Sequence, residues 1–238
     1  MTTMTHSLNP STTNTRAIWQ KVLRAVPSVL LIVAAILILQ SMSKPYWNMH
    51  LDAVQYEYRG GLDILVYVDR MAGRDPEFDE LRELNSLNHY IGMRKLDDAA
   101  EFERSIAEIS VYAFAVLLTL TAVGQFIQWR GRKFVWLLVL PPLSFPFVFL
   151  GDLYYWLRDS GQNLDRNAPF SSSIHPFTPP IWGEGKVGQF ETIASLDTGW
   201  YMVFAASVCI VVALVWALIV ARRGRSAVTT PPTPEGAK

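Results

Sequence analysis

Four long apolar runs, almost free of charged residues, constrain this chain more than any other feature of its sequence. The runs are Val26–Gln40, Ile109–Gln128, Phe134–Leu157 and Trp200–Val220. A helix needs about 20 mainly apolar residues to cross the roughly 30 Å hydrocarbon layer of a bilayer, and the last three runs meet that length. The first run is sufficient if Ser41 and Met42 lie at the interface. We therefore expect a mainly α membrane protein with four transmembrane helices.

The apolar runs divide the chain into predicted regions. Transmembrane helices are expected at 26–42, 108–128, 134–157 and 199–221. An extracytoplasmic domain is expected at 43–107, a cytoplasmic turn at 129–133 and an extracytoplasmic loop at 158–198. The ends, 1–25 and 222–238, are rich in Thr, Ser, Asn or Pro, so both are predicted to be disordered cytoplasmic segments.

Basic residues cluster at three of the boundaries between these regions. The clusters are Arg16, Lys21 and Arg24; Arg130, Arg132 and Lys133; and Arg222, Arg223 and Arg225. Short cytoplasmic flanks retain Lys and Arg, and all three clusters share one side only if both termini are cytoplasmic. The prediction is a multi-pass protein of the inner (plasma) membrane.

The first apolar run also has a second interpretation. A basic segment, an apolar core and the small residues Ser41 and Ser43 resemble a secretory signal peptide. An uncleaved anchor is favoured because the residues at the cleavage position are serines and Met42 extends the core. Residues 43–107 are outside in both interpretations.

Two features of composition exclude classes of site and partner. The single cysteine, Cys209, lies in the fourth run, which excludes an intramolecular disulfide and Cys-based zinc, iron–sulfur or c-type haem sites. Lys+Arg and Asp+Glu both number 21, so the net charge does not point to nucleic acid. The expected partners are the lipid bilayer and other membrane or periplasmic proteins, without nucleic acid.

The segment after the first run predicts a small α/β domain. Leu62, Ile64, Val66 and Val68 alternate with other residues between Gly60 and Gly73, which is typical of one strand. Phe78, Leu81, Leu84 and Leu87 have helical spacing, and Gly92 is the expected stop of that helix. A further helix, capped by Asp97 or Asp98, is expected to run into the second span.

Five residues of the extracytoplasmic segments are candidate metal ligands: Met49, His50, His89, Met93 and His175. Imidazole and thioether groups suit copper(I) where thiolates are missing, so copper is the only cofactor expected. His89 and Met93 are four residues apart and would share a face of a continuous helix. In the alternative interpretation, His89 interacts with the last helical carbonyls and Met93 packs in the core.

Three stretches of the outer segments resemble the signatures of a family of small bacterial integral-membrane proteins. The stretches are "PYWNMHLDAVQYEYRGGLDI", "LNSLNHYIGM" and "FTPPIWGEGKVGQFET". They resemble the family's A-P-Q-Y-P-x-G-L segment, its L-N-H-Y-I-G-M motif, and a Phe-Pro-Gly-rich segment that ends in Q-F. Val54 and Glu57 replace the two usual prolines of the first segment. The resemblance implies that His89 and Met93 carry over, and that the function is linked with maturation of nitrous-oxide reductase or other copper enzymes.

The predicted function is that of a membrane-bound accessory or metal-handling factor that presents His and Met ligands, for copper, on the extracytoplasmic side. The alternative is a structural subunit or scaffold of a larger membrane complex, in which His89 and Met93 only pack. No nucleophile, base and orienting acid can be assembled from spacing, so an enzyme is not expected. Transport would need polar residues through the spans, and these are sparse.

Overall fold

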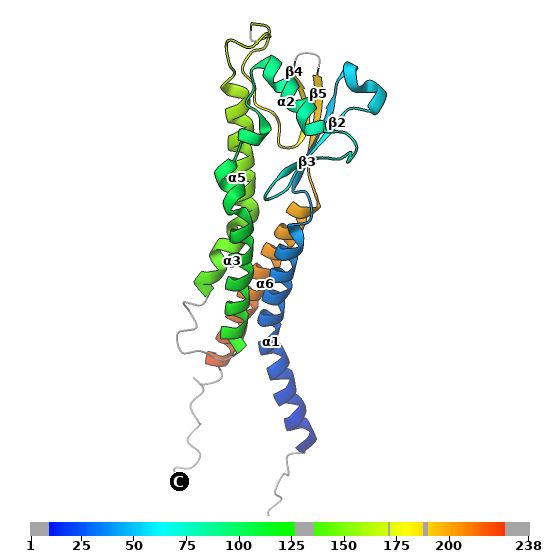
Figure 1. Ribbon diagram of the computed structural model, residues 1–238. Helices are drawn as coiled ribbons and strands as arrows, with labels where there is room; N and C mark the ends of the chain where they lie inside the picture. Colours follow the sequence, from blue (N-terminus) through cyan, green and yellow to red (C-terminus); the bar gives the residue numbers. More distant parts are fainter. Residues whose placement is uncertain (1–9, 127–135, 171, 188–189, 227–238) are drawn as a thin grey trace, which may run out of the picture.

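The computed structural model describes residues 10–126, 136–170, 172–187 and 190–226, which form a helical bundle joined at one end to an α/β domain (Figure 1). The long helices of the bundle are α1 (Pro10–Ser41), α3 (Glu101–Phe126), α5 (Leu140–Gln162) and α6 (Thr198–Ser226). A 3-10 turn, η3 (Trp136–Val139), leads into α5. The sheet domain lies at the end of the bundle where α1 ends and α6 begins (Figure 1).

Three helical stretches of the described residues are long and apolar enough to cross a membrane: Glu101–Gln125, Trp136–Gln162 and Thr198–Val220. They coincide with the second, third and fourth predicted spans and indicate a membrane protein whose helices contact lipid. The apolar part of α1, Ala25–Ser41, is shorter, so its length does not establish a fourth span.

Small residues allow the bundle helices to approach closely. Six alanines are buried where α1, α3 and α6 meet: Ala34, Ala35, Ala115, Ala122, Ala206 and Ala213. A polar contact between α1 and α6 follows from Pro27, which lacks the N–H that would bond the Leu23 carbonyl one turn earlier. Trp216 of α6 donates its indole N–H to that carbonyl at 2.9 Å. A neighbouring helix thus satisfies the backbone group that the proline leaves without a donor.

The α/β domain, called the outer domain here for its position beyond the end of the bundle, is built on one antiparallel sheet of five strands, in the order β3-β2-β1-β5-β4. Strands β1 (Trp47–Asp52), β2 (Leu62–Val66) and β3 (Met71–Gly73) follow α1, whereas β4 (Gly183–Val187) and β5 (Phe190–Leu196) follow α5. In the register of the central strand, Met49 lies opposite Ile64 on β2 and Ala194 on β5. Two segments far apart in the sequence therefore form a single sheet.

Helix α2 (Glu80–Ile91) packs against β2 and β3, and the 3-10 helices η1 (Val54–Arg59) and η2 (Leu96–Asp98) complete the domain. Asp79 caps the start of α2 through the Arg82 amide. Helix α2 ends at Ile91, and the next residue, Gly92, caps it with a φ of 82°, in the left-handed region. The predicted helix and its glycine stop are confirmed.

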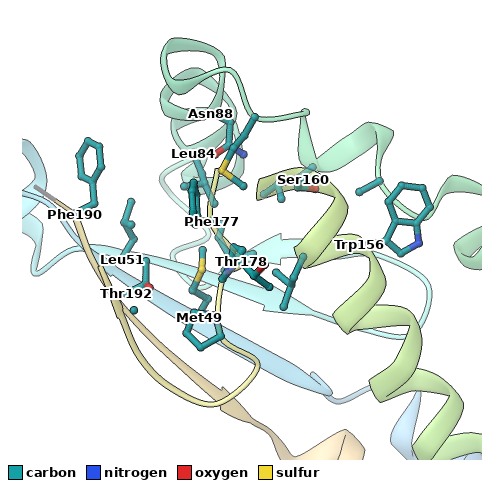
Figure 2. A pocket seen from close by; sticks show the side chains of 18 of the residues that line it. Met49, Leu51, Leu84, Asn88, Trp156, Ser160, Phe177, Thr178, Phe190 and Thr192 are labelled. Carbon is teal, nitrogen blue, oxygen red and sulfur yellow. The ribbon is translucent and has the colours of Figure 1, made fainter. Parts of the chain in front are cut away.

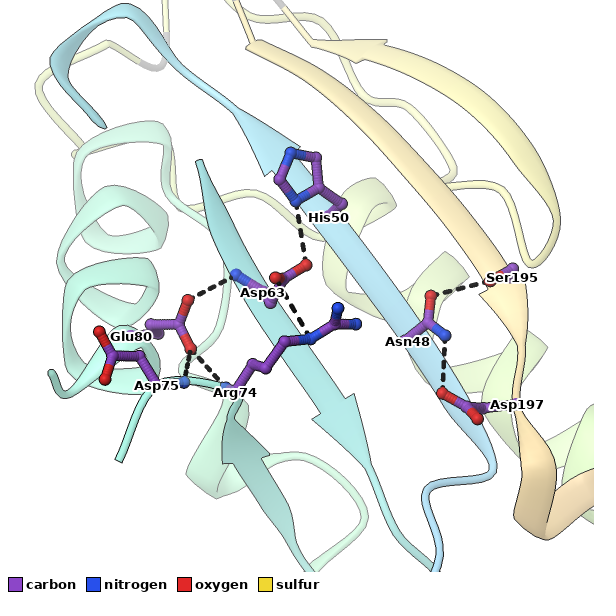
Figure 3. Close-up of polar contacts among 8 residues, drawn as sticks. All are labelled: Asn48, His50, Asp63, Arg74, Asp75, Glu80, Ser195 and Asp197. Carbon is purple, nitrogen blue, oxygen red and sulfur yellow. Dashed lines mark hydrogen bonds and ion pairs between the residues drawn. The ribbon is translucent and has the colours of Figure 1, made fainter. Parts of the chain in front are cut away.

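Glu80 connects the start of α2 to the sheet. Its carboxylate is 6% exposed and accepts backbone N–H groups from Asp63 at 2.9 Å, from Asp75 at 3.0 Å and from Arg74 (Figure 3). A buried charge is stable only when hydrogen bonds replace its hydration, and three amide donors do so here. Glu80 therefore holds β2, the turn after β3 and α2 in one arrangement.

The structure corrects several sequence predictions. The outer domain is not confined to 43–107, because 158–198 contributes β4 and β5 rather than a plain loop, and 43–107 holds three strands instead of one. Residues 10–25, predicted to be disordered, belong to α1, and α6 extends to Ser226. Once the apolar part of a helix has formed, each further residue costs little to add. The predicted turn at 129–133, residues 1–9 and residues 227–238 lie outside the described residues.

We predict that Glu80→Gln lowers the free energy of unfolding by about 1–3 kcal/mol, because an amide NH₂ would replace one acceptor oxygen and face backbone donors. For a domain of this size that corresponds to a fall of roughly 2–10 °C in the unfolding midpoint. Circular dichroism of the purified protein in detergent, recorded as the temperature rises, measures this midpoint. Glu77→Gln, an exposed carboxylate three residues earlier, is the control. Equal midpoints for both variants would contradict the structural role of Glu80.

Candidate functional site

An apolar cavity of about 180 Å³ lies in the outer domain between the sheet, α2 and the end of α5 (Figure 2). Strand β1 contributes Trp47, Met49 and Leu51, which alternate along the strand and so share one face of the sheet. Ile64 and Val66 of β2 and Thr192 of β5 extend the same wall. The inner face of the sheet is therefore the floor of the cavity.

Helix α2 forms the opposite wall. Leu84, Leu87, Asn88 and Ile91 lie at helical spacing on one face of α2 and line the cavity. Figure 2 shows Leu84 and Asn88 extending from α2 toward the sheet, and Met49 extending toward them. Met93 follows the left-handed residue Gly92 and lines the cavity as well.

The third wall comes from the membrane helix α5 and from the segment 177–180. Leu153, Leu157 and Ser160 of α5 line the cavity. The segment is attached to α5 because the Phe177 amide donates to the Gly161 carbonyl at 3.0 Å and Gln162 donates to the Phe177 carbonyl at 3.1 Å. A side chain at Gly161 would collide with that carbonyl, so glycine permits the close approach.

Few polar groups border this cavity. Asn88 is 4% exposed, and its side chain extends from α2 toward this space (Figure 2). The indole Nε1 of Trp156 is buried and has no hydrogen-bond partner among the described residues. Arg94 lies over the Trp156 ring at 5.7 Å and pairs with Asp159 at 3.4 Å. The site thus combines an apolar interior with a small number of polar groups, as ligand pockets do.

The other face of the sheet is polar (Figure 3). His50 Nδ1 lies 2.9 Å from Asp63, whose second oxygen is 3.3 Å from Arg74 Nε. Asn48 donates to Asp197 at 2.8 Å and accepts from Ser195 at 2.8 Å. Partial burial by itself would raise the pKa of Asp197, but hydrogen bonds from Asn48 and Thr198 outweigh it and lower this pKa. These contacts connect β1, β2 and β5 on the face turned away from the cavity.

The structure does not bring the five predicted metal ligands together. Met49 and Met93 line the apolar cavity, whereas His50 follows Met49 on β1 and lies on the opposite face of the sheet. His89 is on the exposed side of α2, beside Asn85 and Lys95, and His175 is exposed between α5 and β4. Among the described residues, no three His, Cys, Asp or Glu side chains are grouped so that they could hold a metal ion.

The "LNHYIGM" stretch is divided between two surfaces. Leu87, Asn88, Ile91 and Met93 line the cavity, while His89 and Tyr90 border a shallow polar depression on the outside. Sequence reasoning emphasised His89 and overlooked the cavity. The alternation of Trp47, Met49 and Leu51 with Asn48, His50 and Asp52 was the signal that could have revealed the inner face of β1.

Comparison with known proteins adds no identification to this geometry. No model of a known protein family matches the chain, and no curated protein matches it. The assignment of function therefore rests on the residues and contacts described above.

Proposed function

We propose that this chain is a multi-pass accessory protein of the plasma membrane that holds its outer α/β domain as a docking scaffold for another membrane or extracytoplasmic protein. In this proposal both termini are cytoplasmic and the sheet faces outward. The observation that carries it is the pair of exposed apolar side chains on η1, Val54 and Tyr58, which are 75% and 76% exposed.

Lipid does not account for the exposure of these two residues. Strand β1 begins at Trp47, just beyond the end of α1, and its six residues extend about 20 Å to η1. Figure 1 places η1 at the part of the sheet domain that is farthest from the bundle. In the proposed orientation, apolar groups on α3, α5 and α6 contact the bilayer, whereas those of η1 lie beyond it and are available to a protein surface.

The 3-10 helix η1 is held rigidly, as a docking element should be. The Tyr56 hydroxyl donates to Glu83 of α2 at 2.7 Å, and partial burial together with this bond raises the pKa of Tyr56 to about 12. The Arg59 guanidinium lies over the Phe78 ring at 4.1 Å and pairs with Asp75 at 3.4 Å. A partner that binds η1 would lose little conformational entropy in this surface, which favours affinity.

A photo-crosslinking amino acid at Tyr58 is expected to give a discrete adduct with a second protein in intact cells. The adduct should be lost when Val54→Asp is added, because a charge beside the crosslinker prevents apolar contact. The same crosslinker at the exposed residue Glu77 is the control for random encounters. No adduct from Tyr58, or identical adducts from Tyr58 and Glu77, would refute the docking role of η1.

The orientation in the membrane gives a separate prediction. Reporter tags at the N-terminus, at Gly131 and at the C-terminus should all give cytoplasmic signals, because the three basic clusters retain these segments inside. A tag inserted at Arg74, after β3, should be accessible from outside. A cytoplasmic signal from Arg74 would reverse the orientation and place η1 in the cytoplasm.

Copper(I) handling is the second candidate function. One observation favours a site with methionine ligands alone. Met49, Met71 and Met93 line the same apolar cavity, and thioethers are soft ligands suited to copper(I). In this version His50, His89 and His175 contribute nothing to the site, because they lie on other surfaces.

This candidate predicts that copper(I) competes successfully against a chelator for the wild type, and that Met49→Leu/Met93→Leu lowers the affinity at least about tenfold through loss of two ligands. Leucine keeps the apolar volume of the site, so the fold should persist. His89→Ala is the matched control and should leave the affinity unchanged. Equal affinity for the wild type and the double variant would leave the scaffold as the only proposed function.

A further inference from the structure

The apolar cavity lies at the depth where the membrane helix α5 leaves the bilayer. The apolar stretch Trp136–Gln162 has 27 residues, about 40 Å of helix, which is longer than the roughly 30 Å hydrocarbon layer. Tyr154 and Tyr155 are 47% and 60% exposed near the outer end of α5, where an aromatic belt marks the interface. Leu153 and Leu157, on adjacent turns, line the cavity.

The residues that surround the cavity pack against the core of the bundle. Phe149 of α5 and Leu196 of β5 pack both against the buried residues of the bundle and against those that surround the cavity. The lining of the cavity and the core of the bundle therefore form one uninterrupted apolar region beside α5.

We infer that the cavity holds the end of a phospholipid acyl chain that rises from the outer leaflet beside α5. Apolar cavities of about 150 Å³ bind benzene in preference to water, so about 180 Å³ has room for a chain end of roughly six or seven carbons. Methionine side chains adapt to ligands of irregular shape, and Met49, Met71 and Met93 all border this space.

Local concentration favours lipid over an apolar solute from water. A chain end that moves from the bilayer into the cavity exchanges one apolar environment for another, since lipid tails are as apolar as leucine. It fills space whose lining atoms would otherwise lack contacts. Because lipid is the solvent of α5, its high local concentration favours occupancy even when the exchange itself is nearly neutral.

Cations near the site suit the phosphate of such a lipid. Lys186 lines the cavity, and Arg94 lies over Trp156, which also lines it. Their side chains are 66% and 45% exposed, so both can reach a headgroup while they keep their partners Glu191 and Asp159.

This inference rests on the outward placement of the sheet domain in the proposed function, and photolabelling tests it. The full chain is reconstituted in nanodiscs that contain a phospholipid with a diazirine at the end of one acyl chain. After illumination, digestion and mass spectrometry, we expect adducts at Met49 and Leu84 in the outer domain, as well as at Val116 and Leu218, which are 55% and 60% exposed on the membrane helices.

A cavity-filling variant supplies the decisive comparison. Leu84→Trp should lose the Met49 adduct and keep those at Val116 and Leu218, whereas Leu81→Trp, on the same helix but outside the cavity lining, should keep all of them. Ala99 lines the cavity at a different position, and Ala99→Leu should have the same effect as Leu84→Trp. This variant replaces Leu84→Trp in the test if Leu84→Trp does not fold. Unchanged labelling of Met49 in a folded cavity-filling variant, or no Met49 adduct in the wild type, overturns the inference. The absence of adducts at Val116 and Leu218 as well would instead refute the placement in the membrane.

Discussion

Strand β1 pairs on both of its edges, and the arrangement of the outer domain follows from this double pairing. β2 occupies one edge and β5 the other, so the segment that follows α1 and the segment that precedes α6 become one sheet. The ladder continues to the membrane helices, because Tyr46 donates to the Val66 carbonyl and accepts from the Asp197 amide, and the Gly199 amide donates to Pro45. A side chain at Gly199 would collide with the Tyr46 ring, so α6 can begin this close to β1 only with glycine.

Tyr46 carries this connection into the bundle. Its ring is fully buried against Phe145 and Phe149 of α5, and its hydroxyl lies 2.6 Å from that of Ser41 at the end of α1. Burial raises the pKa of Tyr46, and the bond to Ser41 opposes that shift only in part. The end of α1, the first half of α5 and the start of α6 therefore meet at one side chain, which helps to fix the orientation of the sheet relative to these helices.

The rigid attachment of the sheet gives its two faces different roles. The inner face is apolar and packs over α5 and α2, which creates the cavity. The outer face carries hydrogen-bonded polar pairs, and η1 at its far end carries exposed apolar groups. Because residues alternate between faces along a strand, Met49 and His50 are neighbours in the sequence but lie in different environments. A scaffold that contacts lipid on one side and protein on the other is consistent with this division.

The sequence by itself determined the apolar helices and the position of α2. Their signals are local: the length of an uncharged run predicts a membrane helix, and the spacing of Leu81, Leu84 and Leu87 with Gly92 at the end predicts α2 and its stop. Only the tertiary structure decided the pairing of β1 with β5, because a short alternating strand fits many partners and its hydrogen bonds reach residues more than 100 positions away. It also decided that the "LNHYIGM" residues separate onto two surfaces. Likewise, Glu80 is buried against one backbone amide of β2 and two of the turn after β3, rather than hydrated at a helix start. Those outcomes depend on which groups the fold brings together in space, and neither composition nor spacing contains that information.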